Sequence, residues 1–392
     1  MSTLNKFIFT CKLVFIIIFN HRTFHYIELN TLSNKIAIKN EYSFPNVYSI
    51  YELFNYNNYN NTVLIFEPFG FHYECSPGFA KYFTDLGYNV DIIMQEIGLD
   101  SFFFFNPLNK IRFFIYRNLK DIEKYAEYLS NIFINYNYAL VETVTPKRFK
   151  LYKKLKLLNI KYSFYVFHHL EYIFNISPKI HLNKNQIWTL GNFTYGIQIN
   201  PHYFGNFKLK RKGDITRFFI TSTIERNYKP LISALEKIKE ENLKFEIIVV
   251  GKWNYFSEYN ISKRIKKHVC FKYNITYLEL YKELYNSDYI IINLDPESKK
   301  DDSFKKSRVS GSIQLSYGFL KPPIINKDFA KIYGFNSNNS FLYDNSNLEK
   351  VMIDAIYLNN YKYKKMQKKL KKAASRIYSI SLENIKKCFD KN

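Results

Sequence analysis

The residues best suited to phosphate chemistry lie in one short stretch that begins at Arg308. Arg308 is followed by Ser310, Gly311 and Ser312, and the apolar spacing after them is typical of a helix. The first turn of a helix presents backbone N–H groups without intrahelical partners, at the positive end of the helix dipole. With serine hydroxyls and a guanidinium beside them, these groups predict a phosphate-binding site, which includes Gln314. The alternative is that Ser310 only caps the helix and the basic side chains are solvated.

Two ionisable clusters follow predicted strands in the first half of the chain. His72 and Glu74 lie on a loop that precedes a helix, where either could remove the proton from a hydroxyl group. The alternative is that they only cap or orient this loop. His168 and His169 follow a later strand, and His169 is the reserve candidate, with a hydrogen-bonding role toward an acceptor. No metal site is predicted, because the two histidines lack a spaced carboxylate or cysteine partner.

Further candidates for anion binding follow strands in the second half. Thr221, Ser222 and Arg226 stand between a strand and a helix, and arginine suits two-pronged contacts with phosphate. Gly251 and Lys252 follow the next strand, where a residue without a side chain lets a ligand approach the backbone. An arginine or lysine at a helix start is more often a surface residue. The common position of these residues at one edge of a predicted sheet favours a single anionic ligand.

Alternating strands and helices must position these residues. In the first half we predict strands at 63–66, 90–94, 138–144 and 162–167, and helices at 77–86, 119–133 and 146–158. In the second half we predict strands at 217–220, 245–250, 269–272, 289–292 and 324–325, and helices at 229–240, 277–285 and after residue 310. Such alternation indicates an α/β protein with two Rossmann-like domains, whose ligands bind beyond the carboxyl ends of the strands.

The domain boundaries follow from the breaks in this alternation. We predict an N-terminal extension at 1–60, a first Rossmann-like domain at 61–207, a second at 208–360 and a helical tail at 361–392. The basic run at 208–213 is the predicted linker. Two such domains joined by one linker face each other across a cleft.

Composition narrows the class of partner. The chain of 392 residues has a formal net charge of +23, which favours polyanions: nucleic acid, anionic lipid headgroups or phosphorylated small molecules. The sequence contains neither GxGxxG nor GxxxxGK[ST], which argues against nicotinamide-dependent enzymes and P-loop NTPases. Its four cysteines have neither disulfide-framework nor zinc spacing, which fits a reducing, cytoplasmic setting. The apolar segment at 6–19 is too short to span a bilayer, so it is expected to pack on the body or lie at a membrane surface.

Residues 215–360 resemble the C-terminal domain of the group 1 glycosyltransferases with the GT-B fold, and residues 60–205 match their N-terminal domain less closely. The resemblance is carried by residues 219–227 with the helix after them, 247–251, 281–289 and 318–325. It implies that the second domain holds a nucleotide-sugar donor and the first presents the acceptor. Transfer would take place in the cleft without an obligatory metal and with no cofactor besides the nucleotide-sugar co-substrate.

The chain departs from the family at the Glu-x7-Glu pair, which falls on Ser307 and Leu315. The family's retaining mechanism therefore does not carry over to this chain. The diphosphate is expected to be held instead by the helix N–H groups with Arg308, Ser310 and Ser312. Arg226 takes the place of a family lysine in the first loop.

These observations predict a glycosyltransferase of the hexosyltransferase type, acting in surface polysaccharide or glycolipid synthesis on a glycan or lipid-linked acceptor. It is expected in the cytoplasm, with peripheral contact to the anionic inner membrane face. The first alternative is a sugar-nucleotide epimerase of the same two-lobed fold. The second is a basic nucleic-acid-binding protein, but the aromatic residues follow apolar periodicity rather than clustering among bases, so no nucleic acid partner is expected.

Overall fold

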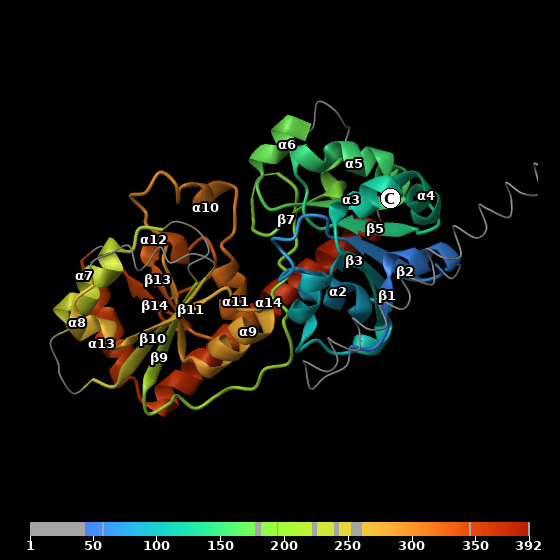
Figure 1. Ribbon diagram of the computed structural model, residues 1–392. Helices are drawn as coiled ribbons and strands as arrows, with labels where there is room; N and C mark the ends of the chain where they lie inside the picture. Colours follow the sequence, from blue (N-terminus) through green and yellow to red (C-terminus); the bar gives the residue numbers. More distant parts are fainter. Residues whose placement is uncertain are drawn as a thin grey trace, which may run out of the picture.

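The computed structural model describes residues 44–56, 59–176, 182–193, 195–221, 226–238, 243–251, 261–344 and 346–390. The predicted N-terminal apolar segment and the candidate residues Ser222 and Lys252 lie outside these ranges. The described chain forms two lobes that lie side by side, each built on one sheet (Figure 1).

The first lobe contains an eight-stranded parallel sheet with the order β1-β4-β3-β2-β5-β6-β7-β8. Its strands are β1 (Val47–Ser49), β2 (Thr62–Phe66), β3 (Asn89–Gln95), β4 (Ile111–Tyr116), β5 (Tyr138–Val141), β6 (Tyr162–Phe167), β7 (Ile187–Thr189) and β8 (Ile197–Gln198). Its α-helices are α2 (Ser76–Asp85), α3 (Leu119–Lys124), α4 (Ala126–Phe133), α5 (Phe149–Lys154) and α6 (Glu171–Ile176). Its 3-10 helices are η1 (Ile50–Asn55), η2 (Glu96–Phe102), η3 (Leu108–Lys110), η4 (Pro146–Arg148), η5 (Leu157–Asn159) and η7 (Lys184–Gln186).

The second lobe contains a six-stranded parallel sheet with the order β11-β10-β9-β12-β13-β14. Its strands are β9 (Thr216–Thr221), β10 (Phe245–Gly251), β11 (Val269–Tyr273), β12 (Tyr289–Ile292), β13 (Pro323–Asn326) and β14 (Phe341–Tyr343). Its helices are α7 (Lys229–Lys237), α8 (Lys263–Lys266), α9 (Tyr277–Asn286), α10 (Ser303–Lys306), α11 (Gly311–Phe319), α12 (Lys327–Ala330) and α13 (Leu348–Tyr357). The long helix α14 (Asn360–Asp390) follows.

Both sheets are covered on both faces, which explains why their strands read as continuous apolar runs. Successive residues of β2 point to opposite faces: Val63 belongs to one hydrophobic cluster and Leu64 to another, and both are fully buried. In β9, Phe218 and Phe219 divide in the same way. The α/β class with two Rossmann-like lobes is therefore confirmed, and a polar group that follows such a strand emerges at the sheet edge.

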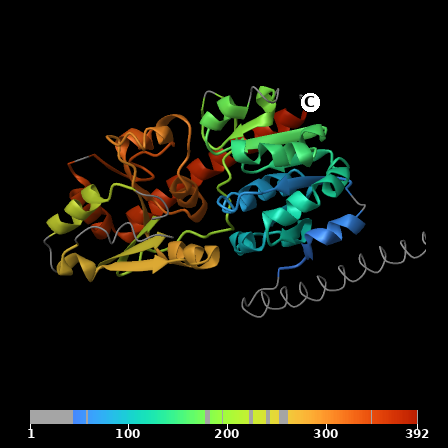
Figure 2. The same ribbon diagram turned by 45° about the horizontal axis from the view of Figure 1, so that its top comes forward.

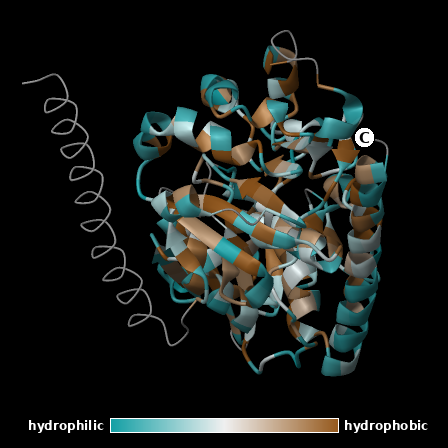
Figure 3. Ribbon diagram, turned by 90° about the vertical axis from the view of Figure 1, so that its right-hand side faces the viewer, coloured by the Kyte–Doolittle hydropathy of each residue, from teal (hydrophilic) through white to brown (hydrophobic). Residues whose placement is uncertain are grey.

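Helix α14 packs on both lobes (Figure 2). Its first half contacts the second lobe, where the Tyr363 hydroxyl donates to the carbonyl of Asp288 at 2.8 Å. Its last turns contact the first lobe, where the Ser381 hydroxyl accepts from the Asn200 N–H at 3.0 Å and Ile385 is fully buried. Figure 3 shows that much of α14 is hydrophilic. The helix thus joins the two lobes through its buried side and leaves a polar side outward.

The segment 201–204, which leaves the first lobe, passes over helices α2 and α11 at points where each helix has a glycine. A Cβ atom at Gly78 of α2 would lie 2.5 Å from the backbone of Pro201, and one at Gly318 of α11 would lie 2.5 Å from the carbonyl oxygen of His202. Such distances exclude a side chain at either position without a backbone shift. These two glycines therefore allow residues 201–204 to pass close against both lobes.

Several predicted elements differ from the observed ones. The expected helix 119–133 is two helices that meet at Tyr125, whose φ of −101° and ψ of 15° are not helical. The helical pattern that runs from 348 to 392 in the sequence is interrupted at Leu358, whose ψ of 121° is not helical. Strands β1, β4, β7, β8 and β14 were not predicted. Strand β1 and the 3-10 helix η1 lie within the expected N-terminal extension, although β1 pairs with β4 in the first sheet.

Candidate active site

A cavity of about 410 Å³ lies between the lobes, at the carboxyl ends of strands from both sheets. The first lobe contributes the loops that follow β2 and β6, and the second lobe contributes the end of β9, helix α9 and the start of α11. Of the sequence-predicted candidates, the cavity brings together ten: His72, Glu74, His169, Thr221, Arg226, Arg308, Ser310, Gly311, Ser312 and Gln314.

The loop after β2 holds His72 and Glu74 as a pair. His72 Nδ1 lies 3.5 Å from Glu74 Oε1, and the Tyr277 hydroxyl of the second lobe donates to Glu74 Oε2 at 3.2 Å. Burial lowers the pKa of His72, but its hydrogen bond and attraction to Glu74, with the charge of Glu67, outweigh that effect and raise the pKa above its usual value. The pair therefore joins a titratable imidazole to a carboxylate held from across the cleft.

His168 lies directly against this pair. Its ring stacks on that of His72 with the centroids 3.8 Å apart, and its Nε2 lies 3.1 Å from the carbonyl oxygen of Glu142. Burial, followed by repulsion from His72 and His169, holds the pKa of His168 well below its usual value. His168 is thus kept neutral and serves as a flat support for the His72 ring.

Two carboxylates that the sequence reasoning missed lie beneath the histidines. Glu67 and Glu142 are fully buried; the Phe69 N–H donates to Glu67 at 2.5 Å, and the Ser76 hydroxyl donates to Glu142 at 2.6 Å. Burial raises the pKa of both groups, and their mutual repulsion raises that of Glu142 further. An available signal was the position of Glu142 inside an otherwise apolar predicted strand, where a charged residue is out of place.

Helix α11 begins at the opposite wall of the cavity. Ser310 precedes it with extended backbone angles and makes no capping hydrogen bond through its side chain, so the reading of Ser310 as a simple cap does not hold. The Ser312 hydroxyl lies 2.8 Å from that of Thr221, at the end of β9. A Cβ atom at Gly311 would lie 3.9 Å from Glu74 Oε1, so the helix start faces the His72 and Glu74 pair directly.

The two predicted arginines line the cavity, but each is paired with a carboxylate. Arg226 forms an ion pair with the nearly buried Asp301 and lies over the Phe304 ring, 4.4 Å from its centroid. Arg308 pairs with Glu171 of the first lobe, with its Nε 3.1 Å from Glu171 Oε1. Neither ion pair follows from the sequence, because the partners lie 75 and 137 positions apart in the chain.

Gly251 does not line the cavity among the described residues. It ends β10, one strand beyond β9, and its carbonyl accepts from the Asn274 N–H at 3.1 Å. The contact between its backbone and a ligand therefore stays a prediction. The Gly251 carbonyl instead takes part in the hydrogen bonding between the end of β10 and the residue that follows β11.

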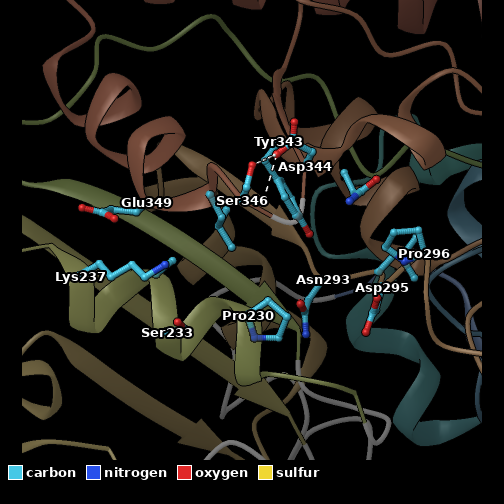
Figure 4. A pocket seen from close by; sticks show the side chains of 14 residues that line it. Pro230, Ser233, Lys237, Asn293, Asp295, Pro296, Tyr343, Asp344, Ser346 and Glu349 are labelled. Atoms are coloured by element: carbon cyan, nitrogen blue, oxygen red, sulfur yellow. Dashed lines mark hydrogen bonds between the residues drawn. The ribbon is translucent and has the colours of Figure 1, made fainter.

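A smaller cavity of about 70 Å³ lies within the second lobe (Figure 4). Its lining includes Asp295, Asp344 and Glu349 and, among the described residues, one cation, Lys237. Hydrogen bonds from Ser346, followed by Lys327, hold the pKa of Asp344 below its usual value, so this carboxyl is ionised. Three carboxylates repel a diphosphate, so this smaller cavity does not suit an anionic ligand.

No group of three or more His, Cys, Asp and Glu side chains in the described ranges is placed to hold a metal ion. A helix both long and apolar enough to cross a membrane is not found in the part of the chain that the structure describes.

The fold and the cavity between the lobes define a two-lobed α/β protein of the GT-B type. No protein-family model and no curated protein matches the sequence. Solved structures with a similar arrangement include a glycosyltransferase from Rickettsia africae, at 17% identity over 86% of this chain and 98% of that one, with a TM-score of 0.48. The Anabaena protein HepE, in complex with UDP and glucose, is 12% identical over 85% of this chain and 100% of that one, with a TM-score of 0.49. A UDP-N-acetylglucosamine 2-epimerase is 13% identical over 81% and 94%, with a TM-score of 0.45.

Proposed function

We propose that the protein is a glycosyltransferase that moves a sugar from a nucleotide-sugar donor, bound by the second lobe, to a hydroxyl group presented by the first. The observation that carries this proposal is the placement of His72 and Glu74 directly opposite the start of α11, with Glu74 Oε1 3.9 Å from the Cβ position of Gly311. A proton acceptor and an anion-binding helix start then face the same small volume.

The helix start suits the leaving diphosphate. Its N–H groups, the hydroxyls of Ser310 and Ser312 and the Arg308 guanidinium are donors at one wall of the cavity. Negative charge develops on the diphosphate as the bond to the sugar breaks, and donors already in place stabilise that charge without rearrangement. Holding donor and acceptor together supplies a further part of the rate increase.

His72 is the proposed general base. In its neutral form it takes the proton of the acceptor hydroxyl, whose oxygen forms the new bond to the anomeric carbon. The bond between that carbon and the diphosphate oxygen breaks, and its electron pair leaves with the nucleoside diphosphate. Glu74 holds the imidazole through the 3.5 Å contact and stabilises its protonated form, while His168 supports the ring from the other side. His169 is the proposed hydrogen-bonding group toward the acceptor.

The proposal extends to the type of acceptor. We infer a hexosyltransferase that acts in the cytoplasm, without a metal or an additional cofactor, on a glycan or lipid-linked acceptor in surface polysaccharide or glycolipid synthesis. The net charge of +23 supports an anionic acceptor or peripheral contact with an anionic membrane face.

An epimerase is the second candidate, because His72, His168 and Glu74 give the first-lobe wall both imidazoles and a carboxylate. The second-lobe wall offers mainly hydroxyls and arginines, which favours transfer. The two functions differ in their products: an epimerase converts the nucleotide sugar itself, whereas a transferase releases nucleoside diphosphate only when an acceptor is present or water replaces it.

The test is a thermal-shift screen of the full chain against UDP-, GDP-, CMP- and dTDP-sugars. We expect one of these donors to raise the melting temperature, and Arg308→Ala to abolish that rise. Arg211→Ala is the matched control, since Arg211 is exposed on the predicted linker away from the cavity. If none of the donors stabilises the protein, or if both variants respond as the wild type does, the donor assignment is wrong.

A further inference from the structure

A second cavity between the lobes, of about 460 Å³, lies next to the active-site cavity. The two cavities share Leu190, which lines both. A side chain at Gly191 would lie 3.0 Å from Val309 Cγ2, so the chain after β7 touches the segment before α11 at this point. The wall between the two cavities is therefore thin.

The second cavity has a strongly basic side. Lys369, Lys372 and Arg376 lie three and four residues apart, on one face of α14, and all three are exposed. No aspartate or glutamate of the described chain lines this cavity, and none forms an ion pair with these three side chains. Three cations that form no ion pair with a carboxylate of the described residues, and that border one hollow, indicate a site for anionic groups.

The other sides of the second cavity suit sugar hydroxyls and sugar rings. Carboxamides of both lobes line it, including Asn192 and Asn338, and an amide both donates and accepts. Apolar side chains lie between them: Ile332 is 40% exposed and Ile380 is 39% exposed. A mixture of amides and exposed apolar surface around a cavity is typical of a site that binds a polar ligand with apolar faces.

We propose that the second cavity binds an anionic glycan, a sugar chain that carries carboxylate or phosphate groups. In this arrangement the chain lies along Lys369, Lys372 and Arg376, in a cavity that Leu190 separates from the one that holds His72. The binding of the glycan stands on the cavity alone, whereas its role as the acceptor rests on the function proposed above. A free glycan and the glycan of a lipid-linked acceptor present the same chemistry to this site.

The experiment measures binding of fluorescently labelled oligogalacturonides, which carry carboxylates, to the full chain, with neutral maltodextrins in parallel. The variant Lys369→Gln/Lys372→Gln/Arg376→Gln removes the three charges of the cavity. Its control, Lys364→Gln/Lys368→Gln/Lys371→Gln, removes three charges from exposed positions of the same helix outside the cavity. Glutamine is nearly as good a helix former as lysine, so both variants should fold, as their circular dichroism melts would verify.

We expect the cavity variant to lose affinity for oligogalacturonides by about tenfold or more, and the control variant by much less. Equal losses in the two variants, or equal binding of charged and neutral chains, would overturn the site. Binding of phosphatidylglycerol vesicles that depends on the three residues, without binding of oligogalacturonides, would overturn it in favour of a lipid surface.

The same titrations separate this inference from the proposed function. Ser312→Ala should weaken the thermal shift with a nucleotide sugar and leave oligogalacturonide binding unchanged. Glycan binding in a protein that no nucleotide sugar stabilises would support the cavity and reject the transferase. A rise in melting temperature with a nucleotide sugar, without glycan binding, would support the transferase and reject the second cavity as a glycan site.

Discussion

His72 and His168 are stacked ring on ring, yet their surroundings drive their pKa values in opposite directions. Glu74 and Glu67 raise the pKa of His72, whereas burial and the neighbouring imidazoles lower that of His168. The proton of the pair therefore belongs to His72, which is also the ring that borders the helix start of the second lobe. A residue that gives up and takes back a proton near neutral pH is what a general base requires.

The first prediction concerns the pH dependence of transfer. The base acts in its neutral form, so kcat/KM should rise with pH through the raised pKa of His72. Glu74→Gln removes the main cause that raises this pKa, so the acidic limb of the profile should move to lower pH. Glu297→Gln, on an exposed loop, is the control and should leave the profile in place. An acidic limb at the same pH in Glu74→Gln would exclude His72 as the group that titrates.

The sequence predicted much of this site because of one rule. Polar residues that follow parallel strands meet at one sheet edge, which predicted Thr221, whereas Arg308 and Ser312 were predicted from their residue types at a helix start. The rule cannot pair residues across the lobes. Tyr277 and Glu74 are 203 positions apart, and Arg308 and Glu171 are 137 apart, so no spacing pattern links them.

Among the elements, α14 has the clearest division between buried and exposed positions. Ile385 is fully buried where the helix meets the first lobe, and Ile380, five residues earlier, is 39% exposed. The spacing of apolar residues from 348 to 392 predicted a helix. The break at Leu358 and the docking of the last turns on the first lobe depend on tertiary contacts instead. Short strands such as β14 were missed for a related reason, since three residues give no measurable alternation.

The second prediction compares these two isoleucines. Ile385→Ala should lower the free energy of unfolding by about 2 to 5 kcal/mol, because it opens a cavity where α14 contacts the first lobe. Ile380→Ala makes the same chemical change at a partly exposed position and should cost about 0.5 kcal/mol or less. Denaturant unfolding of the full chain measures both values. Similar losses in the two variants would mean that the end of α14 does not depend on this contact.

At the scale of the whole molecule, polar contacts cross the cleft between the two lobes. Arg308 pairs with Glu171, the Leu170 N–H donates to the Ser307 carbonyl at 3.2 Å, and Tyr277 bonds to Glu74. Arg308 therefore has a carboxylate of the first lobe as its partner. A donor diphosphate must compete with that carboxylate for the guanidinium.

The third prediction follows from this competition. Glu171→Gln removes the competing charge, so the proposed donor should bind several-fold more tightly, a change of about 1 kcal/mol. Isothermal titration of the donor identified by thermal shift measures the change. Glu123→Gln removes a carboxylate from an exposed ion pair with Arg148 in the first lobe and should leave donor affinity unchanged. Weaker donor binding in Glu171→Gln would show that the carboxylate positions Arg308 rather than competing for it.

The close passage of residues 201–204 over Gly78 and Gly318 also limits how the protein can move. Because the crossing segment lies at contact distance from a helix of each lobe, the lobes cannot move closer together there. A rotation of the lobes about this crossing would displace atoms further the farther they lie from it. A methyl group at either glycine would act as a wedge at the pivot and change the resting angle between the lobes.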